Sequence, residues 1–320
     1  MAAKERVFAI DILRAIAIIG VMVVHSLAVF LGPAAINETW NYLEFVVITF
    51  VLCSGYVNWL SFSAGNKEGH LLSWYGKRFV RLYIPFIVYV AGYALLVYLF
   101  PAFIRGRVIA LTPKFFVSSL FLTGGADVGW LTLLFLQLAL ITPFCIWIAR
   151  GKKRYMLSLC ILGCITLAMV FFPVPTAYSR AVSWVPWSFI FLLGMGMARY
   201  NFLAVTGIFA VIWAVLQFAL LERGAPLAFT LHKYPPDLFY LSYGVAASGI
   251  VFWISKVGET VFKKIYGIIM FFSTHSYGMF FTHVIVLDAV VTSIHHAGVI
   301  PTVFLSIAIT ALVTFVWSLV

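Results

Sequence analysis

Ten apolar stretches restrict the fold of this chain more than any other feature. Most of them approach the roughly 20 residues that an α-helix needs to cross about 30 Å of hydrocarbon. Because lipid offers no hydrogen-bond partners to an open backbone, we expect helices here; the strands of a membrane barrel are shorter and alternate apolar with polar residues. The stretches are residues 8–31, 41–63, 82–100, 128–149, 155–173, 185–200, 202–221, 238–254, 266–292 and 301–320. The sequence therefore predicts an all-α polytopic membrane protein, in which about ten transmembrane helices form one domain over residues 1–320.

The composition excludes the other protein classes. Of the 320 residues, 64% are hydrophobic and 10% are charged, against roughly 45–50% and about 25% in soluble domains. The 31 Phe and 10 Trp residues exclude a disordered chain. The first apolar stretch is long and carries Asp11 and Arg14, so we expect a retained helix rather than a cleaved signal peptide.

The basic residues are distributed unevenly between the two predicted sides of the membrane. If the amino terminus is cytoplasmic, 15 of the 21 basic residues fall on or near that side and 6 fall outside. The cytoplasmic set is Lys4, Arg6, Arg14, Lys67, Lys77, Arg78, Arg81, Arg150, Lys152, Lys153, Arg154, Arg199, Lys256, Lys263 and Lys264. The outside set is Arg105, Arg107, Lys114, Arg180, Arg223 and Lys233. Since Lys and Arg collect on the cytoplasmic side of membrane proteins, this bias predicts that both termini are cytoplasmic. The net charge of +11 is then mainly topological, and we expect no nucleic-acid partner.

The first predicted helix carries a stripe of polar residues. Arg14 and His25 are eleven residues apart, which corresponds to a rotation within about 20° of three full turns and a rise of about 16 Å. Asp11 lies near the same face. Polar side chains inside a membrane are costly and usually mark a pathway or a site, so the stripe predicts a cavity. The alternatives are an Arg14 that snorkels to the boundary, a His25 that only joins helices, and a boundary ion pair of Asp11 with Arg14.

A second basic cluster follows the first predicted cytoplasmic loop. Arg78 and Arg81 are one helical turn apart at the membrane edge, directly after Lys77. Two guanidinium groups at this spacing form a fork for phosphate oxygens. Anchoring of the helix on the cytoplasmic side is the alternative that the spacing alone leaves open.

These motifs together resemble the acyltransferase 3 family of integral membrane acyltransferases. The resemblance depends on Asp11-Ile-Leu-Arg14 followed by His25, on the segment 50–56, and on Lys77-Arg78-Phe-Val-Arg81-Leu-Tyr-Ile-Pro85. Looser matches follow in the order usual for the family, at residues 130–143, 191–194, 233–241 and 276–283. The resemblance thus covers nearly the whole chain.

The resemblance implies a multi-pass enzyme of the cell (plasma) membrane, surrounded by membrane lipid. Such an enzyme moves an acyl group, usually acetyl, from cytoplasmic acetyl-coenzyme A to a hydroxyl of a cell-envelope glycan or a lipid-linked saccharide. His25 corresponds to the essential histidine of the family, and Arg14, Arg78 and Arg81 correspond to its essential arginines. The sequence lacks the extra extracytoplasmic catalytic domain of some members, so we expect onward transfer to a distant acceptor to need a partner transferase.

The chemistry of these residues agrees with that reading. Transfer from a thioester to a hydroxyl needs a base, and an imidazole, whose usual pKa is about 6.5, is suited to this at neutral pH. Coenzyme A is polyanionic, so Arg14, Arg78 and Arg81, with Lys77, are candidates to hold its phosphates. The pantetheine arm is comparable in length with the rise of about 16 Å from Arg14 to His25. Donor and acceptor are then expected to meet at His25 from opposite sides.

Other polar residues in the apolar stretches are weaker candidates. Glu44 is a candidate to orient an acceptor hydroxyl or His25, or only to cap a helix at the interface. Ser54, with Gly55, is more typical of close helix packing, and His283 is more typical of a structural hydrogen bond than of a pocket. The four cysteines are interpreted as small hydrophobic residues, and no metal site is predicted.

A different function class stays open from the residues alone. A polar stripe and an arginine cluster also suit an anion path, so the alternative is a transporter or flippase for a polar or acylated small molecule. The sequence contains no visible repeated half and no paired broken helices, which are typical of many transporters.

Overall fold

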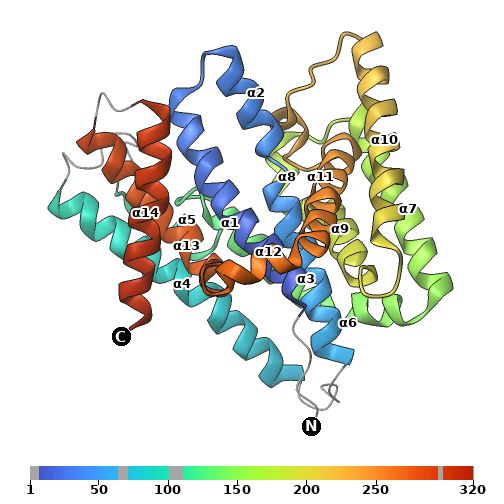
Figure 1. Cartoon of the computed structure of the whole chain (residues 1–320), viewed down its shortest axis with the longest axis horizontal. Helices are drawn as coiled ribbons and strands as arrows, with labels where there is room; N and C mark the ends of the chain where they lie inside the picture. Colours follow the sequence, from blue (N-terminus) through green and yellow to red (C-terminus); the bar gives the residue numbers. More distant parts are fainter. Residues whose placement is uncertain (1–6, 64–70, 101–110, 295–297, 320) are drawn as a thin grey trace.

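The computed structural model describes residues 7–63, 71–100, 111–294 and 298–319, and these residues form helices joined by short connections (Figure 1). The elements are α1 (Phe8–Leu27), η1 (Ala28–Phe30), α2 (Ala34–Leu43), α3 (Val46–Ser63), α4 (Leu71–Leu99), α5 (Pro113–Leu120), α6 (Gly129–Arg150), α7 (Lys152–Phe171), α8 (Thr176–Val182), α9 (Trp184–Gly196), α10 (Phe202–Glu222), η3 (Phe229–His232), α11 (Leu238–Val257), α12 (Glu259–Phe262), η4 (Lys263–Ile265), α13 (Tyr266–Ser293) and α14 (Val299–Ser318). The predicted all-α fold is thereby confirmed.

Nine helical segments of the described chain are long and apolar enough to cross a membrane. The tenth predicted span, residues 185–200, forms the 13-residue helix α9. At 1.5 Å per residue this helix extends about 20 Å, which is too short to cross the hydrocarbon. Every residue from Pro186 to Gly196 is buried. The apolar character of this stretch therefore reflects burial inside the bundle.

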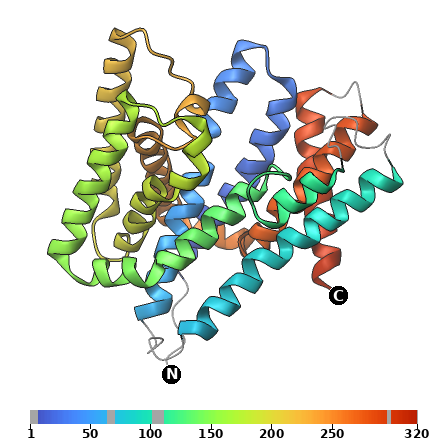
Figure 2. The same ribbon diagram turned by 180° about the vertical axis from the view of Figure 1, so that it is seen from behind.

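The helices divide into an inner and an outer group. In α1, α11 and α13 more than half of the apolar span is buried, whereas α4, α7, α10 and α14 bury less than a quarter. Figure 1 shows α14 at one flank of the bundle and α7 and α10 at the other. Seen from behind, α4 and α6 run side by side (Figure 2). The functional residues discussed below are carried mainly by the inner helices and by α4.

Close backbone contact joins α3 to α9. A Cβ atom on Gly55 would lie 2.1 Å from the carbonyl oxygen of Phe191, and one on Gly194 would lie 2.1 Å from the carbonyl oxygen of Leu52. Only glycine fits at both positions, as in other tightly packed membrane helices. The packing role predicted for Gly55 therefore has a direct structural basis.

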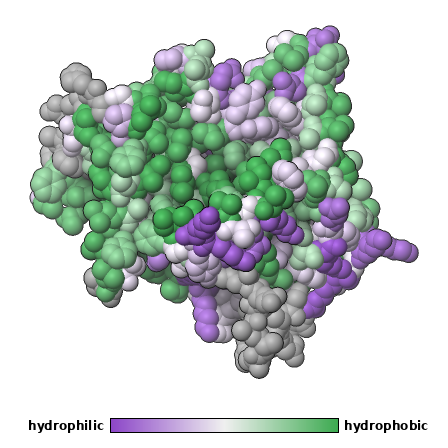
Figure 3. All heavy atoms as spheres, viewed as in Figure 1, coloured by the Kyte–Doolittle hydropathy of each residue, from purple (hydrophilic) through white to green (hydrophobic). Residues whose placement is uncertain are grey.

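Hydrophobic residues cover most of the molecular face drawn in Figure 3, while hydrophilic residues gather at its lower edge and along its upper edge. Helix α1 begins and α14 ends toward the same side of the bundle (Figure 1). That arrangement fits the predicted topology, and the cytoplasmic identity of this side stays a prediction. Five basic residues used for that prediction, Lys4, Arg6, Lys67, Arg105 and Arg107, lie outside the described residues.

Candidate functional site

The predicted arginines line one open pocket, here called the arginine pocket. Its walls come from α1, α3, α4, α6, α9 and α13, and it encloses about 940 Å³ of empty space, counting the solvent at its mouth. Arg14, Arg78, Arg81 and Ser54 all line it. Arg81 is exposed, whereas Arg14 and Arg78 are half-buried. The pocket thus has a basic mouth that leads to a deeper basic wall.

Lys77 is placed differently from its neighbours. Its side chain is exposed, and it is not among the described residues that line the arginine pocket. Arg78 and Arg81, one turn apart on α4, line the pocket, whereas Lys77 does not, although it is four residues before Arg81 on the same helix. Lys77 therefore lies beside the other predicted donor residues on α4 without lining the arginine pocket.

Two polar contacts join the lower part of α1 to α13. A guanidinium nitrogen of Arg14 donates to Oγ of Ser276 at 3.1 Å, and Oγ of Ser273 donates to a carboxylate oxygen of the buried Asp11 at 2.6 Å. Asp11 and Arg14 are three residues apart on one helix, as Ser273 and Ser276 are on the other. The two helices are thus held in register where Arg14 enters the pocket.

Asn58 orients Arg78, and the sequence analysis did not identify it. The Arg78 guanidinium donates to the side-chain carbonyl of Asn58, and lies 5.5 Å from the centre of the Trp74 ring. The amide nitrogen of Asn58 donates in turn to the carbonyl oxygen of Ser54 at 2.8 Å. Asn58 is 5% exposed and lines the arginine pocket. The available signal was an amide side chain in an otherwise apolar helix, one turn after Ser54.

His25 and His283 form a hydrogen-bonded pair across α1 and α13. Nε2 of His283 lies 2.8 Å from Nδ1 of His25, and Nδ1 of His283 lies 3.0 Å from the carbonyl oxygen of Met279. Because a carbonyl only accepts, Nδ1 of His283 carries a proton, and in the neutral ring Nε2 is then the acceptor. His25 donates from Nδ1, so its lone pair is at Nε2. In the neutral pair, the basic nitrogen of His25 is thus Nε2.

His25 opens into a second pocket, here called the histidine pocket, with about 590 Å³ of empty space including solvent at its opening. Glu44, Asp127, Lys233 and Tyr234 share this pocket with His25. Glu44 therefore lies near His25, as the sequence analysis considered. His283 contacts His25 from behind and is not among the described residues that line the pocket.

A buried ion pair forms one wall of the histidine pocket. Nζ of Lys233 donates to a carboxylate oxygen of Glu44 at 2.5 Å, and the two residues are 7% and 3% exposed. Burial acts to lower the pKa of Lys233, but its contacts with Tyr234 and Glu44 outweigh this effect, so the pKa lies above its ordinary value. Lys233 is therefore a fixed cation. The sequence analysis counted it as an outside basic residue and within the looser family match at 233–241, and assigned it no role in the site.

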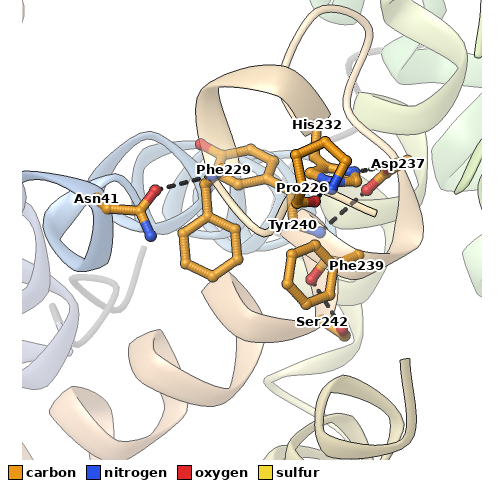
Figure 4. A network of polar contacts seen from close by, with 8 residues as sticks. All are labelled: Asn41, Pro226, Phe229, His232, Asp237, Phe239, Tyr240 and Ser242. Atoms are coloured by element: carbon orange, nitrogen blue, oxygen red, sulfur yellow. Dashed lines mark hydrogen bonds and ion pairs between the residues drawn. The ribbon is translucent and has the colours of Figure 1, made fainter. Parts of the chain in front are cut away.

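Polar contacts fix the segment before α11, which contains Lys233; Figure 4 shows those of Asn41, Phe229, His232, Asp237 and Tyr240. The backbone nitrogen of Phe229 donates to the side-chain oxygen of Asn41 at 2.8 Å, which ties the segment to α2. Asp237 caps α11 by accepting from the backbone nitrogen of Tyr240 at 3.1 Å. The Tyr240 hydroxyl donates to the carbonyl oxygen of Glu44 at 2.9 Å. The same network thus positions both members of the ion pair.

His232 stiffens this segment through contacts from both ring nitrogens. Nδ1 lies 2.5 Å from a carboxylate oxygen of Asp237, and Nε2 lies 2.9 Å from the carbonyl oxygen of Pro226. Burial acts to lower the pKa of His232, but the hydrogen bond and charge of Asp237 and the Pro226 carbonyl raise it more, so the net shift is upward. Two acceptors facing one imidazole favour the doubly protonated ring. The pair is therefore a salt bridge when His232 is protonated.

A third hollow continues from the histidine pocket toward α8. The two share Asp127, Trp130 and Tyr234, and the hollow adds Gln137 and Arg180 to the polar lining. The rings of Trp130 and Tyr234 meet edge to face, with centroids 5.5 Å apart. We call the combined space the outer cleft. It offers aromatic faces beside carboxylate, amide and guanidinium groups.

The comparisons with known proteins agree with this architecture. A family model described as an acyltransferase domain, that of the acyltransferase 3 family, matches residues 7–320. No curated protein and no solved structure matches the chain in the corresponding comparisons. The matched residues include every candidate side chain described above. The chain therefore belongs to the acyltransferase 3 family of membrane acyltransferases.

Proposed function

We propose that this acyltransferase transfers an acetyl group from cytoplasmic acetyl-coenzyme A to a hydroxyl of a cell-envelope glycan or lipid-linked saccharide, with His25 as the general base. The observation that carries the proposal is the contact of His25 with His283, because it orients the imidazole of a residue that lines a pocket next to the arginine pocket. Both termini and the arginine pocket then face the cytoplasm of a plasma-membrane protein.

The arginine pocket suits the donor. Coenzyme A carries several phosphate charges, and guanidinium groups bind phosphate through paired hydrogen bonds. Arg81 at the mouth and Arg78 and Arg14 further in provide a graded series of such groups. Beyond them the lining turns apolar, with Phe50 and Phe191, which suits the slim pantetheine arm.

The reaction uses the hydrogen-bonded histidine pair. Nε2 of His25 takes the proton of the acceptor hydroxyl while the oxygen attacks the thioester carbonyl carbon. The carbon–sulfur bond then breaks, and the sulfur leaves with the proton that His25 returns, as the free thiol of coenzyme A. His283 accepts from Nδ1 of His25 throughout, so it is a positioning residue that holds the ring in one tautomer.

The outer cleft suits the acceptor. Saccharides present several hydroxyl groups around an apolar ring face, and the cleft offers Asp127 and Gln137 beside the rings of Trp130 and Tyr234. Glu44 is neutralised by Lys233 and lines the same pocket as His25. These groups support binding of an acceptor hydroxyl next to the base.

The proposal is tested with [14C]acetyl-coenzyme A and membranes of the native host from which the gene has been deleted. The wild-type protein, supplied again, is expected to move label into the glycan or glycolipid fraction, and His25→Ala is expected to abolish this. His275→Ala is the matched control, because His275 bonds the carbonyl oxygen of Phe271 within its own helix and lines neither pocket.

Two results would contradict the proposal. Full transfer by His25→Ala would remove His25 as the base. Uptake of an acylated molecule into vesicles without any covalent transfer of label would instead identify a transporter.

A further inference from the structure

The side chain of Phe280 lines both the arginine pocket and the histidine pocket. We propose that Phe280 is a movable partition between the two pockets, which moves aside once an acceptor is bound so that the thioester end of the donor reaches His25. In the absence of an acceptor the ring separates the thioester from the water of the histidine pocket. This inference rests on the proposed function. It gives Phe280 the role of controlling when the acetyl donor reaches the acceptor.

The position of Phe280 follows from the pairing of α1 with α13. Ser276, Phe280 and His283 are spaced by four and three residues, so they lie along one face of α13. Ser276 accepts from Arg14, and His283 contacts His25. Along α13, Phe280 therefore lies between Ser276, which contacts Arg14 at the arginine pocket, and His283, which contacts the proposed base His25.

The surroundings of the ring make it an effective barrier. Phe280 is 4% exposed, and its ring centroid lies 5.8 Å from that of His283 and 5.4 Å from that of Phe281. The ring thus fills the space next to the residue that orients His25. Replacing it by a methyl group would leave a cavity that joins the two pockets, since both already reach this side chain.

A barrier at this position matters because water competes with the acceptor. If water enters, its oxygen attacks the thioester carbonyl carbon, the carbon–sulfur bond breaks, and acetate and the free thiol of coenzyme A leave. His25 would take the proton of water as readily as that of an acceptor hydroxyl. Excluding water until the acceptor is bound is a general means of suppressing this side reaction.

The partition is tested first without any catalysis. Val21 is 3% exposed and lines the histidine pocket but not the arginine pocket. A Val21→Cys chain, with the four native cysteines replaced by alanine, is placed in sealed vesicles of known orientation. Sulfonatoethyl methanethiosulfonate is then added from the side of the arginine pocket. We expect slow labelling with Phe280 present and labelling about tenfold faster with Phe280→Ala, while labelling from the opposite side is unchanged.

The control is Phe281→Leu, because Phe281 is equally buried on α13 but lines neither pocket. This variant is expected to label at the slow rate. If Phe280→Ala does not fold, as judged by its thermal unfolding in detergent, Phe280→Leu replaces it and is expected to give an intermediate rate. Equal labelling rates with and without the Phe280 ring would overturn the partition, as would fast labelling of the chain that retains it.

The second measurement is thiol release from acetyl-coenzyme A by purified protein without an acceptor. Phe280→Ala is expected to raise this rate about tenfold over the wild type, and adding His25→Ala is expected to remove the increase. If the wild type transfers acetyl groups but Phe280→Ala releases thiol at the wild-type rate, the partition is overturned and the proposed function is not. A wild type that neither transfers nor hydrolyses acetyl-coenzyme A would instead overturn the proposed function, whatever the labelling result.

Discussion

Nδ1 of His25 lies 2.8 Å from Nε2 of His283, and the other nitrogen of His283 faces the carbonyl oxygen of Met279 at 3.0 Å. The Met279 carbonyl fixes the proton on His283, and His283 in turn fixes the proton on His25. A backbone group one turn away on α13 therefore decides which nitrogen of His25 is basic. The arrangement resembles that of catalytic histidines in other enzymes, whose second nitrogen is held by a fixed acceptor, and it supports the proposed role of His25.

Replacing His283 should lower the rate of the chemical step more than it weakens substrate binding. His283→Ala removes the acceptor for Nδ1 of His25, so the ring loses its tautomer, and we expect kcat to fall about a hundredfold with little change in KM. His283→Gln keeps an acceptor oxygen near the same position and should recover much of this loss. Steady-state kinetics of acetyl transfer decide the point, and equal rates for the Ala variant and the wild type would contradict it.

Arg78 and Arg81 should determine the affinity for the donor. Arg78→Ala and Arg81→Ala each remove a proposed phosphate ligand, and we expect KM for acetyl-coenzyme A to rise about tenfold in each case at low salt. The difference from the wild type should become smaller at high salt, because salt screens the interaction that is lost. Arg154→Ala removes an equal charge from the predicted cytoplasmic set at an exposed position outside the arginine pocket. An equal effect in all three variants would show that the two arginines only anchor α4.

Part of the candidate site was predictable from helical periodicity. Arg14 and His25 were expected on one face of the first helix, and in the structure each forms a polar contact with the same neighbouring helix, α13. Ser276 was not predictable as the partner of Arg14, because the two residues are 262 positions apart and only tertiary packing brings them together. His283 was expected to form a structural hydrogen bond, and its partner proved to be His25.

The remaining differences arise where hydropathy and loop position are ambiguous. The stretch 185–200 is as apolar as a span, but burial inside protein and burial in lipid favour the same side chains, and α9 is too short to cross. Lys233 lies between two predicted spans and was therefore expected in an exposed outside loop. In the structure its side chain is buried and forms an ion pair with Glu44. Asn58 gave only the weak signal of one amide in an apolar helix.

The ion pair of Glu44 and Lys233 should be costly to break from either side. Glu44→Gln leaves Lys233 as a buried charge, and Lys233→Met leaves Glu44 as one, so each should lower the free energy of unfolding by about 3–5 kcal/mol. The double variant Glu44→Gln, Lys233→Met leaves no unpaired charge and should recover part of this loss. Thermal or denaturant unfolding in detergent measures the cycle, and additive losses in the double variant would contradict it.

The pair of His232 and Asp237 should make stability depend on pH. The folded state raises the pKa of His232, against burial, through Asp237 and the Pro226 carbonyl, whereas the unfolded chain has the ordinary value of about 6.5. The stabilisation is therefore fully present below about pH 6.5 and is lost as the pH rises through the raised pKa of the folded state. The wild type should show a falling thermal unfolding midpoint over this interval. Asp237→Asn keeps an oxygen to cap α11 but removes the charge, so its midpoint should change less with pH; an unchanged pH dependence in this variant would refute the assignment.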